Sequence, residues 1–390
     1  MRDIYRKYMK NAIIKELNLL FSQPREYYFD KIKFQFNNFD FKLYNQVILF
    51  GAKNMGMMYV DFCKQNSIEV LAFCDNDKAK QGGKLKGISV ISPDQLKKIY
   101  SQGIPIIITS VHEEEIKSQL TGLGFKNVWS FRYFAIFYPN RFKNPHWINS
   151  IDYILNNKNK ILEVVALLKD DQSLKTYLNV LKYRLFLNRN FLKEVLAPLD
   201  LEYFDKNIVN LTDNEVFIDG GAFTGDTMIG FIKATHKSFK NIIAFEPDAK
   251  NYKELEKTRI SLHNRKISVH KLGLGEKTGI VSFSSDGTAA SMIEKGGITN
   301  IKLIDLDSFL EKEKIIPSII KLDIEGAEKE ALIGAKQIIK NYRPKLAICI
   351  YHKPSHLWEL PLLINKFNKN YKFYIRHYTD VIYDSVCYAV

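Results

Sequence analysis

Residues 216–226 read VFIDGGAFTGD, an apolar strand with an acid at its end and glycines where the chain must turn into a helix. Glycines let the backbone turn tightly and approach a ligand closely, and the amides of the next helix, starting near Thr227, remain free to donate hydrogen bonds. The pattern is typical of a cofactor site in an α/β fold. We expect cofactor contacts from its acids and turn glycines: Asp219, Gly220, Gly221, Gly225 and Asp226.

A second apolar run, IIAFEP, follows this turn and ends in Glu246. In α/β cofactor domains an acid about 20 residues beyond the glycine turn binds the ribose diol of the cofactor. We therefore expect Glu246 to accept hydrogen bonds from the ribose hydroxyls.

The acid at Asp219 helps to identify the cofactor. In NAD-type folds the space beside the glycine turn holds a pyrophosphate, which a carboxylate at this place would repel. S-adenosylmethionine has no phosphate, and its cationic amino-acid end and sulfonium both suit an acid. Asp219 as a helix N-cap, or as a brace of the turn, remains the alternative.

The rest of the C-terminal half alternates strand and helix patterns. Apolar runs rich in β-forming residues recur at 267–272, 319–322 and 346–351, as expected of a parallel sheet covered on both faces. The last two runs, 371–377 and 381–390, are separated by a short polar turn and must pair as an antiparallel hairpin. A reversed final strand indicates a class I methyltransferase fold rather than a dehydrogenase.

The stretch KLDIEGAE at 321–328, followed by a helix and a strand leading to YHK at 351–353, resembles the hallmark of FkbM-type methyltransferases. The resemblance covers about residues 210–390 and includes FIDGGAFTGD, AFEPDAKNY, IDLDSFL, LWELP and YKFYIRHY. It implies S-adenosylmethionine-dependent O-methylation, often of sugars or of glycan and polyketide hydroxyls. His356 departs from the pattern, because relatives often carry an acid there.

The N-terminal half contains a second unit of the same type. VILFGAKNMG at 47–56 is a strand, a glycine turn and a helix start, and VLAFCDND at 70–77 is the next strand. The unit resembles the N-terminal Rossmann-like domain of bacterial nucleotide-sugar acyltransferases, which implies a nucleotide or nucleotide-sugar site involving Asp75 and Asp77. Lys53, however, replaces the second glycine of G-x-G-x-x-G. A docking or dimerisation module that has lost its ligand, and hence a homo-oligomer, is the equal alternative.

Between the two α/β units, residues 142–204 carry apolar residues at helical spacing and lack the enrichment in Pro, Gly and Ser that marks flexible linkers. We predict a helical bridge. The fold class is therefore α/β with two Rossmann-like domains joined by this bridge, and the second domain has a class I methyltransferase fold with a reversed final strand. The predicted ranges are an N-terminal helical segment, an accessory domain, the bridge and an FkbM-type domain, at 1–40, 41–138, 139–208 and 209–390.

Composition narrows the remaining possibilities. The 390 residues are 46% hydrophobic, which is enough for more than one core, and no run approaches the length of a membrane-spanning helix. The start lacks a secretory signal and the four cysteines are scattered, so we expect a reducing cytoplasm. The net charge of +14 arises from lysines interleaved with acids, so a solvated surface is favoured over nucleic-acid binding.

The candidates for catalysis follow two strands. In KLDIEG, alternation leaves Asp323 at the mouth of the strand and Glu325 just beyond, and Lys321 is expected to pair with a neighbouring acid because an unpaired buried ammonium is costly. His352 follows the next strand and has an unperturbed pKa near neutrality, so it or Asp323 is a candidate base for an acceptor hydroxyl. A structural role for Glu325 at the helix N-terminus, or for His352, remains open.

A divalent metal is a further alternative, because Asp323, Glu325, His352 and His356 could converge as oxygen and imidazole ligands. Their spacing alone is not a metal signature, and we favour a site with no metal ligands.

The chain is thus expected to be a cytoplasmic, bacterial methyltransferase that uses S-adenosylmethionine to modify a hydroxyl of a sugar, nucleotide sugar or surface-glycan precursor. The alternative is a non-catalytic nucleotide-sugar-binding or scaffold protein with a relict methyltransferase fold.

Overall fold

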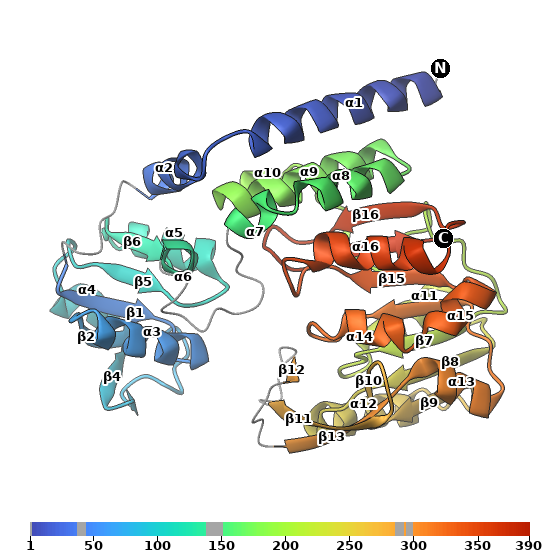
Figure 1. The fold of residues 1–390 in the computed structure, drawn as a ribbon. Helices are drawn as coiled ribbons and strands as arrows, with labels where there is room; N and C mark the ends of the chain where they lie inside the picture. Colours follow the sequence, from blue (N-terminus) through green and yellow to red (C-terminus); the bar gives the residue numbers. More distant parts are fainter. Residues whose placement is uncertain (1, 37–43, 138–150, 285–291, 294–298) are drawn as a thin grey trace. The chain divides into compact units, whose positions relative to one another are not determined.

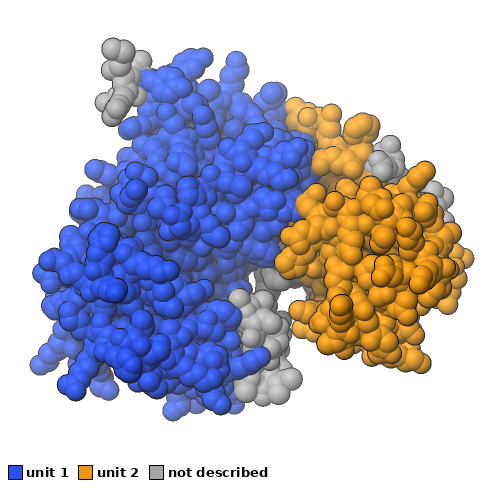
Figure 2. Space-filling view, turned by 180° about the vertical axis from the view of Figure 1, so that it is seen from behind, with its two compact units in different colours: residues 1–22, 153–390 blue, residues 23–152 orange. Residues whose placement is uncertain are grey.

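The computed structural model describes residues 2–36, 44–137, 151–284, 292–293 and 299–390. The chain forms two compact units, coloured separately in Figure 2: unit 1 comprises residues 1–22 and 153–390, and unit 2 comprises residues 23–152. The predicted range 1–40 is therefore shared between the two units. Parts of this range (37–40) and of the predicted bridge (139–150) lie outside the described residues.

A seven-stranded sheet forms the centre of unit 1, in the order β16-β17-β15-β14-β7-β8-β9 (Figure 1). The final strand β17 runs antiparallel to both of its neighbours, and the other pairs are parallel. The predicted hairpin and the reversed final strand are confirmed. The strands are β7 (Val216–Gly220), β8 (Asn241–Phe245), β9 (Ile267–His270), β14 (Ile319–Leu322), β15 (Lys345–Cys349), β16 (Phe373–His377) and β17 (Ser385–Ala389).

Helices cover both faces of this sheet (Figure 1), which explains why its strands are apolar runs rather than alternating patterns. Asp248 and Asp305 begin two of the helices by accepting backbone amide hydrogen bonds at their N-termini. The helices are α11 (Asp226–Ala234), α12 (Ala249–Ser261), α13 (Leu306–Glu313), α14 (Glu328–Ile333), α15 (Lys336–Tyr342) and α16 (His356–Phe367). Among the described residues, no helix is long and apolar enough to cross a membrane.

A small second sheet in unit 1 was not predicted. Helical patterns were expected between β9 and β14, but a four-stranded sheet of order β10-β13-β11-β12 precedes α13. Both of its edge strands are only two residues long, so the sequence carries little alternation there. The strands are β10 (Gly273–Leu274), β11 (Gly279–Ser284), β12 (Met292–Ile293) and β13 (Thr299–Ile304).

The helices before β7 pack on the sheet of unit 1. Arg376 of β16 lies 2.6 Å from the carboxylate of Asp170, which also caps α9. Tyr177 of α9 donates a hydrogen bond to the Leu357 carbonyl of α16 at 3.0 Å. Much of the predicted bridge is therefore an integral layer of unit 1, together with the first helix of the chain. These helices are α1 (Arg2–Phe21), α7 (Ile151–Leu155), α8 (Lys158–Leu167), α9 (Asp171–Phe186) and α10 (Asn190–Lys193).

Unit 2 is a separate Rossmann-like sheet of order β3-β4-β2-β1-β5-β6, parallel except for the β3–β4 pair. Gly56 lets α3 pack closely on β1, since a Cβ there would lie 2.2 Å from the Gly51 carbonyl oxygen. The strands are β1 (Gln46–Phe50), β2 (Glu69–Cys74), β3 (Lys84–Leu85), β4 (Ile88–Ile91), β5 (Ile106–Ile108) and β6 (Val128–Ser130). The helices are α2 (Arg25–Gln35), α3 (Asn54–Gln65), α4 (Pro93–Ile99), α5 (Glu113–Gly122) and α6 (Phe131–Phe137).

Candidate active site at the carboxyl ends of three parallel strands

Three carboxylates mark the ends of three adjacent parallel strands of unit 1. Asp219 is the second-last residue of β7, Glu246 follows β8 directly, and Asp323 follows β14 directly. Because these strands are parallel neighbours, their carboxyl ends meet at one edge of the sheet, where open α/β sheets bind ligands. The structure therefore brings together the acids that the sequence pattern predicted.

Lys321 and Asp219 form a buried ion pair across β14 and β7. Lys321 Nζ lies 3.1 Å from Asp219 Oδ1 and donates a hydrogen bond to the Gly221 carbonyl at 2.8 Å. Burial alone would lower the pKa of Lys321, but the charges of Asp219 and Asp323 outweigh burial and hold it above its ordinary value. The expected pairing of Lys321 is confirmed. Since its side chain is 2% exposed, it positions the glycine turn and contacts no open surface.

Asp219 itself is fully buried. Burial raises its pKa, and the Lys321 charge opposes this shift. Apart from the ion pair, neither carboxylate oxygen has a hydrogen-bond partner in the described part of the chain. A buried acid with free acceptor positions is suited to a cationic group that approaches the glycine turn.

The space beside the glycines of the turn is occupied by other parts of the protein. Gly221 has φ +74°, and a Cβ there would meet the Asp323 carbonyl oxygen at 1.8 Å. Gly220 packs against the side chains of Leu322 and Leu274. These glycines are needed for the close approach of β7 and β14, and their predicted contact with a cofactor remains a prediction.

Gly225 and Asp226 start helix α11. Gly225 is its N-cap with φ +97°, and its Cβ position faces Met228, Thr258 and Leu255. Asp226 is exposed, and its carboxylate accepts a hydrogen bond from the Thr227 amide. The helix begins one residue before the predicted start.

Glu246 is buried and faces the glycine turn. Its Oε2 accepts a hydrogen bond from the Phe223 amide at 3.0 Å, and its Oε1 accepts one from the Asp248 amide at 2.9 Å. Burial raises the pKa of Glu246 to about 7, against the effect of these two amides. Each carboxylate oxygen keeps a second acceptor position, so a ribose hydroxyl could still donate to it.

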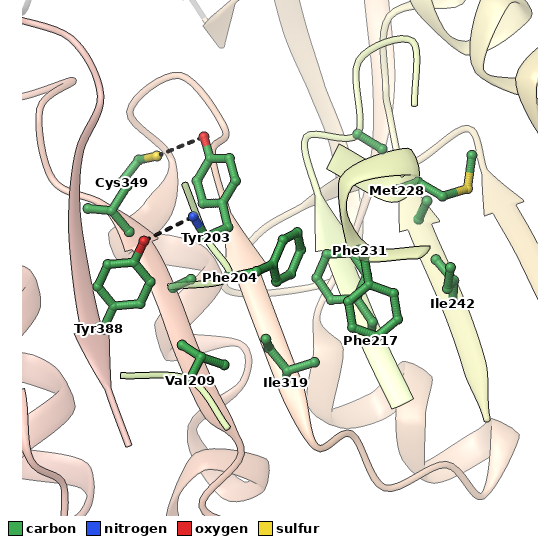
Figure 3. Close-up of a cluster of buried hydrophobic side chains, with 14 of the residues drawn as sticks. Tyr203, Phe204, Val209, Phe217, Met228, Phe231, Ile242, Ile319, Cys349 and Tyr388 are labelled. Carbon is green, nitrogen blue, oxygen red and sulfur yellow. Dashed lines mark hydrogen bonds between the residues drawn. The ribbon is translucent and has the colours of Figure 1, made fainter. Parts of the chain in front are cut away.

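Two tyrosines fix the carboxylate of Asp323. Tyr203 donates a hydrogen bond to its Oδ2 and Tyr351 donates one to its Oδ1, both at 3.0 Å. Figure 3 shows Tyr203 beside Cys349 and Tyr388, and the Tyr388 hydroxyl accepts a hydrogen bond from the Tyr203 amide at 2.9 Å. Asp323 is thereby oriented by one residue from the loop before β7 and one from the segment after β15.

His352 stands among three carboxylates. Its Nδ1 lies 2.9 Å from Glu328 Oε1, and its Nε2 lies 3.4 Å from both Asp323 Oδ1 and Glu325 Oε2. Burial alone would lower the pKa of His352, but Glu328 and Glu325 outweigh burial and raise it well above 6.5. These carboxylates favour the protonated imidazole, and the role of His352 as a base remains a prediction.

Glu328 is the fixed anion behind His352. It is fully buried, and its Oε1 accepts hydrogen bonds from the amides of Ile324 and Gly326, at 2.9 and 3.3 Å. His356 Nδ1 lies 3.2 Å from the other oxygen, Oε2. Although burial opposes it, the two histidines hold the pKa of Glu328 well below its ordinary value. Glu328 is therefore the buried carboxylate that both histidines share.

Three of the four candidate metal ligands come together. Ligand atoms of Asp323, Glu325 and His352 all lie within 4.8 Å of one another. His356 turns to Glu328 instead and does not join this group. Glu325 reaches the group from a strained turn, since its φ of +53° precedes a φ of +97° at Gly326.

Further acids surround this group that sequence reasoning missed. Burial, followed by the charges of Asp384 and Asp323, raises the pKa of Glu202 to about 8, and burial also raises the pKa of Asp384 to about 6. Such pKa values indicate that the acids are crowded. A bound cation would reduce the repulsion between them. Tyr351 could have been inferred from its place before His352, whereas Glu202 and Tyr203 lie in a loop with no recognisable motif.

The corresponding acids of unit 2 are already paired with groups of the protein itself. Asp75 Oδ2 accepts a hydrogen bond from the Ala52 amide at 2.8 Å and lies 3.0 Å from Lys80 Nζ. Asp77 lies 3.5 Å from the same ammonium. Lys53, in place of the second glycine, is exposed at the N-cap of α3. A nucleotide site in unit 2 remains a prediction.

The crystal structure of Methyltransferase FkbM from Methylobacillus flagellatus KT has the same fold, with a TM-score of 0.74 and 22% sequence identity over 99% of this chain and 100% of that chain. Two curated proteins named redox-sensing transcriptional repressor Rex match shorter stretches. The one from Geobacillus kaustophilus is 26% identical over 122 residues, 29% of this chain and 57% of the relative. The one from Geobacillus sp. strain WCH70 is 27% identical over 106 residues, 26% of this chain and 49% of the relative. The chain thus spans about half the length of these curated relatives.

Two family models match the chain. Residues 43–128 match a model described as C2185-like, N-terminal, and the resemblance of this half to nucleotide-sugar acyltransferases remains a prediction. Residues 219–375 match the Methyltransferase FkbM domain, a range that begins at Asp219 and contains Glu246, Asp323 and His352. The C-terminal region of this chain is therefore similar to the Methyltransferase FkbM domain over these residues.

Proposed function

We propose that residues 209–390 bind S-adenosylmethionine and transfer its methyl group to a hydroxyl of a sugar, nucleotide sugar or surface-glycan precursor. The observation that carries the proposal is the set of carboxylates Asp219, Glu246 and Asp323 at one edge of three parallel strands. A cofactor with two cationic groups suits this edge, and a pyrophosphate does not. The acceptor class rests on the resemblance of residues 210–390 to the family.

The residues of the chain fit this cofactor in a simple way. Glu246 would accept hydrogen bonds from the ribose hydroxyls, and Asp219 would attract the amino-acid end through the glycine turn. When bound, S-adenosylmethionine supplies a methyl group on a positively charged sulfur. The remaining chemistry, holding the acceptor oxygen in line and removing its proton, falls to the protein.

Asp323 is the residue that we assign to proton removal. Its two tyrosine hydrogen bonds fix its orientation, and it directly follows the carboxyl end of β14, where the acceptor is expected. The hydroxyl proton would pass to Asp323 as the oxygen–carbon bond forms and the carbon–sulfur bond breaks, which leaves a neutral thioether. Lys321 and Glu328 would act as positioning residues, since neither faces an open surface.

Calorimetry of the full chain with S-adenosylmethionine tests the proposal. We expect Glu246→Gln to weaken binding by roughly tenfold or more, because a charge-assisted hydrogen bond is lost. Glu256→Gln, which removes a half-buried partner of Arg259 on α12, is the matched control and should bind as the wild type does. Because the carboxylate is the accepting form and burial raises its pKa to about 7, affinity should rise as the pH rises through neutrality.

The same titration separates the two functions. Tight NAD binding by the domain, or unchanged affinity in a folded Glu246→Gln variant, would remove the cofactor assignment. A wild-type chain that binds no S-adenosylmethionine would instead support the relict scaffold. Labelled cofactor with a panel of nucleotide sugars and glycan precursors then identifies the acceptor.

A further inference from the structure

We propose that Asp323, Glu325 and His352 form a binding site for one divalent cation, with Mn²⁺ as the ion that best suits their mixed ligand set. One ligand atom of each residue lies within 4.8 Å of the other two. The three come from the turn after β14 and from the residues directly after β15, which are parallel neighbours. Neighbouring strand ends of one sheet therefore hold all three candidate ligands.

The separations fit a bound ion. His352 Nε2 lies 3.4 Å from Asp323 Oδ1 and 3.4 Å from Glu325 Oε2. Two ligand atoms about 2.1 Å from one ion are about 3.0 Å apart at a right angle and about 3.4 Å apart at the tetrahedral angle. The side chains thus need only small movements to enclose an ion.

His352 gives an independent indication of a ligand. Its side chain is 6% exposed, its Nε2 points into the cluster, and that atom makes no hydrogen bond of acceptable geometry within the described part of the chain. On the opposite side of the ring, Nδ1 lies 2.9 Å from Glu328 Oε1. Metal-bound histidines almost always have a carboxylate or carbonyl behind the second ring nitrogen, and Glu328 is held there by two backbone amides.

The chemistry of the ligands selects the kind of ion. Two carboxylates and one imidazole suit a first-row divalent ion, whereas Mg²⁺ and Ca²⁺ prefer oxygen ligands alone. Asp323 and Glu325 remain 23% and 26% exposed, which leaves positions for water or an acceptor hydroxyl. The catalytic use of the ion rests on the proposed function: it would promote loss of the acceptor proton in place of direct transfer to Asp323.

Titration of the metal-free full chain with Mn²⁺ alone tests the site without S-adenosylmethionine. Calorimetry measures the binding, and pulsed electron paramagnetic resonance reports on the ligands of the bound ion. We expect one Mn²⁺ per chain with a ¹⁴N coupling from a histidine, and at least tenfold weaker binding in Asp323→Asn and His352→Gln. Glu254→Gln, on an exposed part of α12, matches the change in charge and should bind normally. His112→Gln removes an exposed histidine 3.6 Å from Glu115, and it should also leave the nitrogen coupling intact.

The nitrogen coupling is measured on the wild-type chain, so the test survives a variant that fails to fold. Mn²⁺ binding without that coupling, equal binding in folded Asp323→Asn and His352→Gln variants, or no binding at all would overturn the proposal. Each of these results leaves the calorimetry with S-adenosylmethionine untouched. Failure of the metal site is therefore distinguishable from failure of the proposed function.

Discussion

Lys321 and Asp219 are register partners on neighbouring parallel strands, and their charged atoms lie 3.1 Å apart with both side chains almost completely buried. A buried pair of this kind adds little to stability by itself, because removing two charges from water is costly. The loss of one partner is different, since the other charge is then buried alone. Their relationship therefore makes a prediction about stability as well as about the site.

Lys321→Met should lower the free energy of unfolding by about 3–5 kcal/mol, because Asp219 would be left as an uncompensated buried charge. The additional change Asp219→Asn should recover part of that loss. Urea unfolding of the single and double variants measures both effects. Lys329→Met, which breaks a half-exposed pair with Glu359 in the same unit, should cost at most about 1 kcal/mol. A similar cost for both lysines would contradict the role of Lys321.

Gly221→Ala should be among the most damaging single changes at the turn. An added Cβ would lie 1.8 Å from the Asp323 carbonyl oxygen, which the neighbouring strand holds in place. Gly326→Ala is the matched control, because its φ is also positive but the atom nearest to its Cβ would be in the flexible side chain of Lys353, at 3.2 Å. We expect the control to cost about 1–2 kcal/mol, the price of a left-handed residue with a side chain.

Denaturant unfolding compares the two alanine variants, and Gly221→Ala should lose several kcal/mol more than Gly326→Ala or fail to accumulate as folded protein. Equal losses would mean that the two strands can separate at little cost. The close approach of β7 and β14 would then not explain the glycine.

Much of the fold could be predicted from the sequence because its signals are local. Apolar runs of strand length gave the parallel strands, and the short turn after His377 gave the reversed final strand. The small sheet of β10–β13 was missed because its two edge strands have only two residues each and carry no alternation of their own. The helices before β7 were predicted as helices, but only tertiary contacts such as Arg376 with Asp170 show which layer they join.

The candidate site was only partly predictable, because its chemistry depends on contacts between distant segments. Asp323 and His352 follow strand ends and were found by that rule, whereas Tyr203 reaches Asp323 across 120 residues of sequence. The unperturbed pKa of histidine made His352 a candidate base, and the nearby Glu328 and Glu325 raise that pKa. A pKa shift of this kind follows from neighbours in space and cannot be seen in a motif.

His377 makes the stability of unit 1 dependent on pH. Burial lowers its pKa to about 4, and its Nδ1 lies 2.8 Å from the Ser385 hydroxyl. Between pH 6.5 and about 4 the unfolded chain binds one more proton than the folded chain, so the stabilising effect is complete above pH 6.5 and is lost as the pH falls. The expected slope is about 1.4 kcal/mol per pH unit for one proton.

Urea unfolding at several pH values checks this slope. His377→Gln should flatten the dependence between pH 6.5 and about 4, while His263→Gln on an exposed turn should leave it unchanged. An identical slope in all three proteins would show that other groups are responsible for the acid sensitivity.

Asp323 should be the residue on which the reaction rate depends most. Asp323→Asn keeps the shape of the side chain and can still accept from one tyrosine, but it cannot take a proton or carry the charge that a cation would need. We expect kcat to fall by roughly two to four orders of magnitude, with the affinity for S-adenosylmethionine changed only a few fold. Tyr203→Phe and Tyr351→Phe, which each remove one hydrogen bond to Asp323, should reduce kcat less.

The rate of S-adenosylhomocysteine formation with the identified acceptor gives kcat for the wild type and the three variants, and Glu359→Gln is the folded control. A chelator distinguishes the two routes, since it should abolish turnover only if the cation removes the proton. If Asp323→Asn stays within a few fold of the wild type, and the chelator has no effect, the reaction depends on positioning alone.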